Sequence, residues 1–322
     1  LHIYFLHAPD FLGYPSGIEL ARADPDTVRR GLQLKKVGNR LMEVIGGREI
    51  HPVNPRVGGF WRAPTRQEIL GLAPEVEWAL TAAEATCDWV AGFDFPELSV
   101  DYEFVALSDP DEYAIIGGRV VSNRGIDIPV DRWPEIFLEE HVEWSNALHA
   151  RVRGRGSYHV GPLARYNLNY GRLHPRARVA AERAGLAPMV TNPFRSIVVR
   201  AVEVVHAAAT IIDLLDRYTP PDPPYAEASP RAAVGHGASE APRGLLYHRY
   251  QIDEEGLIRD AVIVPPTSQN QLRIEEDLRT LLPGLLDQED SQITHRLEQA
   301  IRNYDPCISC ATHFLDMRLD RR

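Results

Sequence analysis

The sequence predicts a mainly α-helical fold that carries small antiparallel β-sheets, an α+β arrangement. Long stretches repeat apolar residues at spacings of three and four, which is the period of a buried helix face. Shorter β-type runs are separated by turn residues, which favours hairpins and meanders. Strands and helices do not alternate, so a parallel sheet is not expected. With 322 residues and 44% hydrophobic composition, the chain can bury a large core.

Two helical regions are predicted near the start of the chain. The first enters at Pro25-Asp26 and stops at Gly46-Gly47. Residues 48–60 contain several Pro and Gly pairs and are predicted to form a loop. A capping-box pattern at Thr65 then opens helical sequence that continues to about Val90.

A β-rich insert is predicted at about 98–130. Runs of β-forming residues at 102–107, 113–116 and 119–121 are separated by Asp-Pro, Gly-Gly and Asn-Arg-Gly turns. The simplest arrangement is an antiparallel meander of these strands.

A long buried helix is predicted to open at Asn192-Pro193 and to run to about Tyr218. It is apolar almost all round, which is typical of a helix inside a core. Polar residues nevertheless follow one face at helical spacing: Ser196, Arg200, Glu203, His206, Thr210 and Asp213. Either this face is solvated, or it is buried with paired charges that face a subunit or a cofactor.

The last third of the chain is predicted to form a hairpin followed by two helices. Residues 220–233, rich in Pro, Ala and Asp, form a surface connection. The β-type runs 244–252 and 257–264 flank an acidic turn that ends in glycine, which predicts a hairpin. Helices are expected at 275–282 and 292–303.

Composition narrows the function. The formal net charge of −10 argues against binding to nucleic-acid phosphates. The three cysteines, Cys87, Cys307 and Cys310, argue against a disulfide framework and for a reducing compartment. We expect neither a signal peptide nor a membrane-spanning segment. The sequence starts at Leu1 inside apolar, element-like sequence, so we expect a fragment cut within a helix.

The main candidate for chemistry is the run Asp305-Pro306-Cys307-Ile308-Ser309-Cys310-Ala311-Thr312-His313. Asp305 fits a helix N-cap and Pro306 fits the first helical position. Cys307, Cys310 and His313 would then share one face of a short helix. The helix dipole would stabilise thiolates, which are the form that binds metals. From the spacing alone, a metal site, a zinc half-site and a redox dithiol all remain open.

This run resembles the C-terminal nickel-binding signature DPCxxCxxH of [NiFe]-hydrogenase large (catalytic) subunits. Further strings resemble segments of the same family, in the family's order: Leu1 to Leu6, Gly46-Gly47-Arg48 with His51-Pro52 and Gly58-Gly59, Val160-Gly161-Pro162-Leu163-Ala164-Arg165, Glu240-Ala241-Pro242-Arg243-Gly244 and Val264-Pro265-Pro266-Thr267. The resemblance implies the hydrogenase large-subunit fold around a bundle of long helices. It also implies one large-subunit domain over 1–322, truncated at its N-terminus, with a metal-binding segment at 235–313.

The resemblance assigns roles by position. Cys307 is implied as a terminal nickel thiolate, and Cys310 as a thiolate that bridges nickel and iron. His313 is implied as a ligand of a magnesium or iron ion, together with the Val262 carbonyl. Arg243 is implied over the open side of the metal pair, where it assists cleavage of dihydrogen or binds a cyanide. Pro242 and Thr267 are implied to line the diatomic ligands, and Pro266 stands where many relatives have Ser or Thr.

Without the resemblance, the same residues have structural explanations. Arg243 would be a surface arginine, and Thr267 would hydrogen-bond its own loop. His51 would be a loop histidine, Arg165 a helix-surface or subunit-contact residue, and Cys87 a small buried hydrophobic residue.

The implied activity is the reversible oxidation of dihydrogen at a nickel–iron centre that carries carbon monoxide and cyanide. Electrons would pass to an iron–sulfur small subunit, and through diaphorase-type subunits to a nicotinamide or deazaflavin, as in the soluble cytoplasmic enzymes. A nickel chaperone and a maturation protease, which would remove the tail 314–322, are further implied partners. The family's N-terminal RxCGxC motif is absent from this sequence, so the fragment alone would be inactive. The alternatives are a metal-free structural relative of the respiratory NADH dehydrogenase large subunit, and a zinc or redox CxxC protein.

Overall fold

The computed structural model describes residues 1–307 and 318, which form two compact units. Unit 1 contains Leu1–Phe93, His174–Gly185 and Ala201–Arg231. Unit 2 contains Asp94–Leu173, Leu186–Arg200 and Ala232–Arg322. The predicted α+β class is confirmed, because helices dominate and the sheets are small and antiparallel. Within the described residues, no helix has the length and apolar character needed to cross a lipid bilayer.

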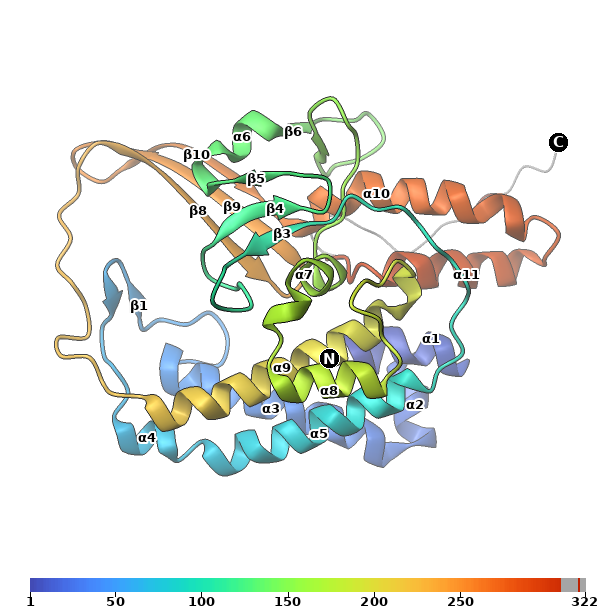
Figure 1. The fold of residues 1–322 in the computed structure, drawn as a ribbon, viewed down its shortest axis with the longest axis horizontal. Helices are drawn as coiled ribbons and strands as arrows, with labels where there is room; N and C mark the ends of the chain where they lie inside the picture. Colours follow the sequence, from blue (N-terminus) through green and yellow to red (C-terminus); the bar gives the residue numbers. More distant parts are fainter. Residues whose placement is uncertain (308–317, 319–322) are drawn as a thin grey trace. The chain divides into compact units, whose positions relative to one another are not determined.

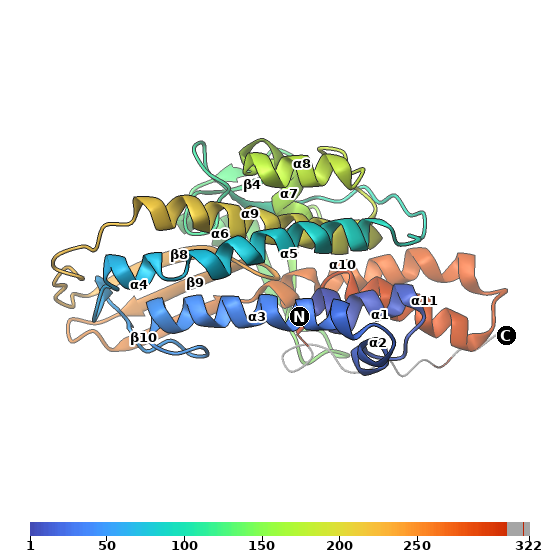
Figure 2. The same cartoon turned by 90° about the horizontal axis from the view of Figure 1, so that it is seen from below.

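Unit 1 is built around the packed helices α3 (Pro25–Gly46) and α5 (Ala73–Ala91), which Figure 2 shows lengthwise. The Asp24 side chain caps α3 by accepting from Thr27 N, and α3 ends at the left-handed Gly47. The predicted capping box at Thr65 is present and opens α4 (Arg66–Leu70). The smaller elements of unit 1 are the π-helix Ile3–His7, α1 (Ala8–Leu12), α2 (Gly17–Ala23), β1 (Pro55–Arg56), β2 (Gly59–Phe60) and α8 (Pro175–Arg183).

The described residues of unit 2 form three antiparallel sheets. The predicted insert forms the sheet β3-β4-β5, with β3 at Val105–Ser108, β4 at Arg119–Ser122 and β5 at Asp127–Ile128. The predicted strand at 113–116 is wrong. Tyr113 and Ala114 are buried in the core instead, and Ile116 makes only an isolated bridge to Ser239.

The largest sheet of unit 2 has the order β10-β9-β8, with β8 at Ala233–Ala241, β9 at Gly244–Ile252 and β10 at Ile258–Val264 (Figure 1). The predicted hairpin of β9 and β10 is confirmed, whereas β8 was not predicted. The third sheet pairs β6 (Phe137–Glu140) with β7 (His149–Val152). The three sheets share one buried core, which includes Val105, Val120, Phe137, Val152 and Tyr247.

The helices of unit 2 position the C-terminal segment. α10 (Pro266–Leu281) packs against α11 (Asp290–Arg302), as Figure 1 shows. α10 starts well before the predicted residue 275, so the expected loop at 264–270 is mostly helix. The remaining elements are the 3₁₀ turns Val130–Arg132, Tyr170–Arg172, Pro193–Arg195 and Leu282–Leu285, with α6 (Trp133–Ile136) and α7 (Pro162–Asn169).

The long predicted helix is confirmed as α9 (Ser196–Arg217), which runs from unit 2 into unit 1. Its first turns are buried, with Ile197, Val198 and Val199 fully enclosed. Of the polar face, Ser196 and Arg200 are buried, while the members from Glu203 to Asp213 are half-buried. Burial of that face is therefore confirmed for Ser196 and Arg200, while a subunit or a cofactor opposite it stays a prediction.

Candidate metal site

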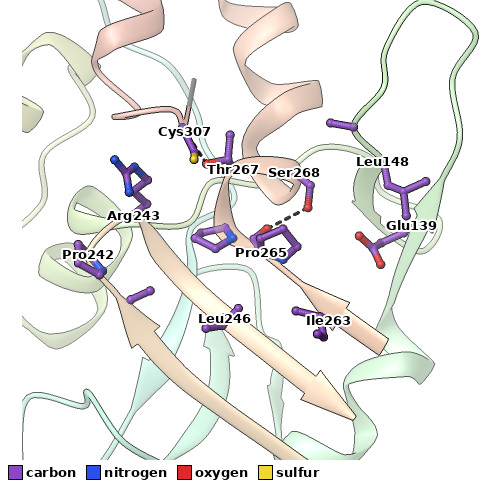
Figure 3. Close-up of a pocket in the computed structure, with 13 residues that line it drawn as sticks. Glu139, Leu148, Pro242, Arg243, Leu246, Ile263, Pro265, Thr267, Ser268 and Cys307 are labelled. Atoms are coloured by element: carbon purple, nitrogen blue, oxygen red, sulfur yellow. Dashed lines mark hydrogen bonds between the residues drawn. The ribbon is translucent and has the colours of Figure 1, made fainter. Parts of the chain in front are cut away.

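Four residues singled out from the sequence line one pocket of about 440 Å³ in unit 2 (Figure 3). Pro242 and Arg243 form the turn between β8 and β9, Thr267 lies in the first turn of α10, and Cys307 follows the end of α11. The rest of the lining is largely apolar and consists of Ala147, Leu148, Ala241, Leu246, Ile263, Pro265 and Pro266, with Glu139 and Ser268 as polar members. Cys310 and His313 lie outside the described residues.

Thr267 is hydrogen-bonded to the cysteine segment. The Cys307 backbone N–H donates to Thr267 Oγ1 at 3.3 Å. Thr267 is itself buried, with 5% of its surface exposed, whereas Cys307 is half-buried. The Thr267 hydroxyl therefore ties the backbone of Cys307 to the start of α10, and is not used only within its own loop.

Arg243 is anchored by Asp305. Arg243 Nε donates to the Asp305 carbonyl oxygen at 2.6 Å, and Nη2 lies 3.4 Å from Asp305 Oδ1. The Asp305 side chain is only 11% exposed, whereas that of Arg243 is 40% exposed and borders the pocket. Arg243 is thus a pocket residue with one edge of its guanidinium fixed by the backbone that leads to Cys307.

The predicted helix start at Asp305 is wrong for residues 305–307, which the structure describes. Asp305 has a φ of 50°, in the left-handed region, and neither Pro306 nor Cys307 is helical. An N-cap residue normally has β-region dihedrals, so Asp305 departs from that geometry. The helix start that meets Cys307 is instead that of α10, whose first turn includes Thr267. The positive end of its dipole favours a thiolate in the pocket.

The start of α10 is fixed by buried amide side chains. Asn270 Nδ2 donates to the Val160 carbonyl at 2.9 Å, and Asn270 Oδ1 accepts from Val160 N at 2.9 Å. Gln269 Nε2 donates to the carbonyl oxygens of Leu245 on β9 and of Val264. These bonds hold Thr267 in place relative to the β8–β9 turn.

Two glycines allow the β8–β9 turn to lie directly on the 160–165 segment. A Cβ on Gly161 would lie 2.7 Å from the Arg243 carbonyl oxygen, and one on Gly244 would lie 2.8 Å from Gly161 N. Both residues also have positive φ, at 118° and 137°. Two of the strings singled out from the sequence therefore meet backbone to backbone at the pocket.

Arg165, in α7, was expected either on a helix surface or at a subunit contact. The expectation of a surface position is wrong. Its side chain is 5% exposed and pairs with Glu240, whose side chain is fully buried, at 3.1 Å. Both residues were missed as site residues. The available signal was their place inside two strings that matched one family, since nothing in the local charge pattern distinguishes them.

The three residues before Pro306 are each held by a separate contact. The Asn303 carbonyl oxygen accepts from Ser196 Oγ and from Arg200 Nη2, both at 2.9 Å. Tyr304 donates its hydroxyl to Asp277 at 2.5 Å, and Asp305 accepts from Arg243. The approach to Cys307 is therefore fixed by contacts from α9, α10 and the β8–β9 turn.

A buried polar cluster surrounds Tyr304. Tyr102 also donates to Asp277, at 2.6 Å, and the His159 ring lies 4.7 Å from that of Tyr304 between ring centroids. Burial lowers the pKa of His159 to about 3, reinforced by the positive charges of Arg200 and Arg273. Burial also raises the pKa of Asp277, against the opposing effect of its hydrogen bonds.

Of the other sequence candidates, Val262 lies on β10 in unit 2, whereas Cys87 and His51 lie in unit 1. Cys87 is fully buried, and burial raises the pKa of its thiol to about 12, as expected for a structural cysteine. His51 is an exposed loop residue with a φ of 54°. Throughout residues 1–307 and 318, no three His, Cys, Asp or Glu side chains group closely enough to hold a metal.

A nickel–iron group fits the residues that are described. The pocket offers a cysteine beside a helix N-terminus, one cation and a largely apolar lining. A soft thiolate suits nickel and iron, and apolar walls suit small uncharged ligands. Of the two cysteines of the motif, the described residues include Cys307.

Comparisons with known proteins point to one family. The family described as "Nickel-dependent hydrogenase" matches residues 143–313. Sulfhydrogenase 1 subunit alpha of Pyrococcus furiosus is 30% identical over 317 residues, which cover 97% of this chain and 74% of that protein. NAD-reducing hydrogenase HoxS subunit beta of Cupriavidus necator is 30% identical over 333 residues, with 92% of this chain and 67% of that protein covered.

Solved structures show the same fold. An NAD⁺-reducing [NiFe]-hydrogenase in the H₂-reduced state superposes with a TM-score of 0.84 at 24% identity, over 97% of this chain and 76% of that one. A [NiFeSe] hydrogenase of Desulfovibrio vulgaris Hildenborough gives a TM-score of 0.70 at 21% identity, over 97% and 78% of the two chains. The chain therefore has the hydrogenase large-subunit fold.

Proposed function

Because this chain belongs to the nickel-dependent hydrogenase family, and is thus an oxidoreductase acting on H₂, we propose that the pocket around Cys307 is its catalytic centre. The reaction is the reversible conversion of one H₂ into two protons and two electrons. The observation that supports this most strongly is the convergence of Pro242, Arg243, Thr267 and Cys307, from three distant parts of the chain, on one pocket.

Cys307 and Cys310 are proposed to hold the metals, Cys307 as a terminal ligand of nickel and Cys310 as a bridge to iron. When bound, a nickel–iron group with carbon monoxide and cyanide ligands would supply the centre that polarises H₂ and takes up its electrons. His313 and the Val262 carbonyl are proposed to bind a magnesium or iron ion. These assignments follow the family motif position by position.

The side chains of the pocket are proposed to have three roles: accepting a proton, providing a positive charge and shaping the wall. Cys307 Sγ would hold one proton when the H–H bond breaks unevenly. The Arg243 guanidinium acts as a hydrogen-bond donor and as a positive charge. Its anchor on Asp305 fixes where that charge lies. Pro242 and Thr267 shape the wall that faces the diatomic ligands and exclude water from it.

The electron path is proposed from the relatives. The names of these relatives describe subunits of hydrogenases, one of them NAD-reducing. We place an iron–sulfur small subunit as the first electron acceptor, followed by diaphorase-type subunits that reduce a nicotinamide or deazaflavin, in the cytoplasm. A nickel chaperone and a maturation protease that removes 314–322 belong to the same proposal, as does a single large-subunit domain over 1–322.

Metal content tests the proposal. The full-length gene product, made together with its maturation proteins and partner subunits, is expected to contain about one nickel per chain and to oxidise H₂. Cys307→Ser should lose both nickel and activity. Cys87→Ser, which changes a buried cysteine of unit 1, should keep both. A product that carries zinc, or no metal, in the wild-type protein would contradict the proposal.

A further inference from the structure

We propose that Arg165 and Glu240 are positioning residues that fix the Ala241-Pro242 backbone, and through it Arg243, at the edge of the metal pocket. The proposal rests on the proposed function, because it gives these two residues a task in that pocket. Neither side chain lines the pocket itself. They would act through the turn that does.

The Arg165 guanidinium reaches three acceptors on one side of the β8–β9 turn. Nη1 donates to Glu240 Oε2 at 3.1 Å and to the Ala241 carbonyl at 2.8 Å, and Nη2 donates to the Pro242 carbonyl at 3.1 Å. Ala241 and Pro242 both line the pocket. The guanidinium therefore binds the backbone immediately before Arg243.

Glu240 transmits this anchorage to the core of unit 2. Its Oε1 accepts from the Leu107 backbone N–H on β3 at 2.8 Å, while Oε2 pairs with Arg165. The side chains of Glu240 and Arg165 are 0% and 5% exposed, so the pair is isolated from water. A buried pair of this kind is weak evidence for stability but is well suited to fixing a geometry.

The turn needs such an anchor because of its position. Pro242 and Arg243 lie between the paired residues Ala241 and Gly244, so this is a two-residue hairpin turn at the end of β8 and β9. A turn of this kind has no ladder hydrogen bonds beyond its ends and can tilt about the hairpin. Arg165 binds the Ala241 and Pro242 carbonyls of the turn. Gly161, in the 160–165 segment, lies against the Arg243 carbonyl. Together they leave the turn one orientation.

Two explanations of the pair make different predictions. If Arg165 merely neutralises the Glu240 charge, a lysine would replace it well. If Arg165 positions the turn, a lysine would fail, because one ammonium cannot reproduce the planar fork that reaches Glu240 and two carbonyls. Arg165→Lys therefore separates positioning from charge neutralisation while keeping a cation in place.

The test compares Arg165→Lys with Arg155→Lys in the complete enzyme with its partner subunits. Arg155 is the matched control, because it pairs with another buried carboxylate of unit 2, Glu103, at 2.7 Å, without touching the turn. We expect Arg165→Lys to keep its nickel but to shift the infrared bands of the iron-bound diatomic ligands. It should also lower kcat for H₂ oxidation by about tenfold to a hundredfold, the loss typical of a misplaced catalytic group. Arg155→Lys should leave both quantities at the wild-type value.

A second readout does not depend on the metal. Backbone hydrogen exchange in the metal-free chain, followed by mass spectrometry, should speed up in the peptide that covers 241–246 for Arg165→Lys and not for Arg155→Lys. If Arg165→Lys fails to fold, Glu240→Gln against Glu103→Gln replaces the pair, since Gln keeps the acceptor for Leu107 N and removes the ion pair.

The outcomes separate the two proposals. Wild-type infrared bands and wild-type exchange at 241–246 in Arg165→Lys, or the same changes in both lysine variants, would overturn the positioning role. A wild-type enzyme without nickel or infrared bands would overturn the proposed function instead, and the exchange experiment would still decide whether Arg165 orders the turn.

Discussion

Arg243 Nε donates a 2.6 Å hydrogen bond to the carbonyl oxygen of Asp305, so the pocket arginine is bound to the backbone that leads into Cys307. The guanidinium and the cysteine are therefore positioned by one short piece of chain, although they are far apart in the sequence. A change in the path of residues 305–307 would move both groups together.

Replacing Arg243 by lysine should separate the charge from this anchor. Lysine has no Nε donor at that position, so Arg243→Lys loses the bond to Asp305 and leaves a mobile ammonium. We expect H₂ oxidation to fall by about a hundredfold with the nickel content unchanged, as for the loss of one preorganised donor. Arg249→Lys is the control, since Arg249 pairs with Asp260 on the same sheet. More than half of the wild-type activity in Arg243→Lys would show that the anchor does not matter.

The Thr267 hydroxyl should stabilise the metal-ligating segment. Thr267→Val removes the acceptor of the Cys307 N–H and should lower the free energy of unfolding by about 1 kcal/mol. Nickel should then be lost to a chelator faster than from the wild type. Thr267→Ser keeps the hydroxyl and should behave like the wild type in both measurements. Equal nickel loss from the valine and serine variants would exclude this role for the hydroxyl.

The close approach at Gly161 should not tolerate a side chain. Gly161→Ala places a Cβ 2.7 Å from the Arg243 carbonyl oxygen, at a φ of 118°. Gly154→Ala controls for backbone strain, because Gly154 also has a positive φ of 71° but no atom within 4 Å of its Cβ position. We expect Gly161→Ala to cost at least about 2 kcal/mol more than Gly154→Ala in chemical denaturation. Equal costs would mean that the turn can move away without penalty.

The sequence predicted the structure correctly where a short local pattern determines the local backbone. The capping box at Thr65, the α3 helix and the β9–β10 hairpin follow from short-range spacing, and they are found as predicted. β8 was missed because its Gly, Ala and Ser residues have little β-propensity. It forms because all of Ala233–Ala241 pairs with β9.

The residues that were missed depend on distant partners. The stretch 265–270, where α10 starts, contains two prolines and four polar residues and looks like a loop. Asn270 and Gln269 nevertheless fix it to Val160 and Leu245. Arg165 looks like an exposed helix residue, and only the fold brings Glu240 to it. Local propensity carries no information about such contacts, which form only when tertiary packing is complete.

The buried histidine beside Tyr304 predicts a pH dependence of stability. The pKa of His159 is about 3 in the folded state, well below its ordinary value, so below about pH 6.5 the unfolded chain binds a proton that the folded chain does not. Stability should fall as the pH drops from about 6.5 towards 3, by up to about 1.4 kcal/mol per pH unit from this group. Asp277 acts in the opposite direction, because its pKa is raised. The positive charges that act on His159 are those of Arg200 and Arg273.

The difference between the wild type and His159→Gln isolates the histidine. Urea denaturation at several pH values between 4 and 7 should give a smaller loss of stability on acidification for the variant. Parallel curves for the two proteins would show that His159 titrates alike in the folded and unfolded chains.

The separate anchoring of Asn303, Tyr304 and Asp305 bears on which ion the protein accepts. Ordering backbone costs about 1–2 kcal/mol per residue, and here that entropy is lost during folding rather than on metal binding. The approach to Cys307 is thus preorganised before any ion arrives. If Cys307 holds the metal, as proposed, an ion that would need this stretch to bend must break these contacts. Residues that never touch the metal would then contribute to discrimination between ions.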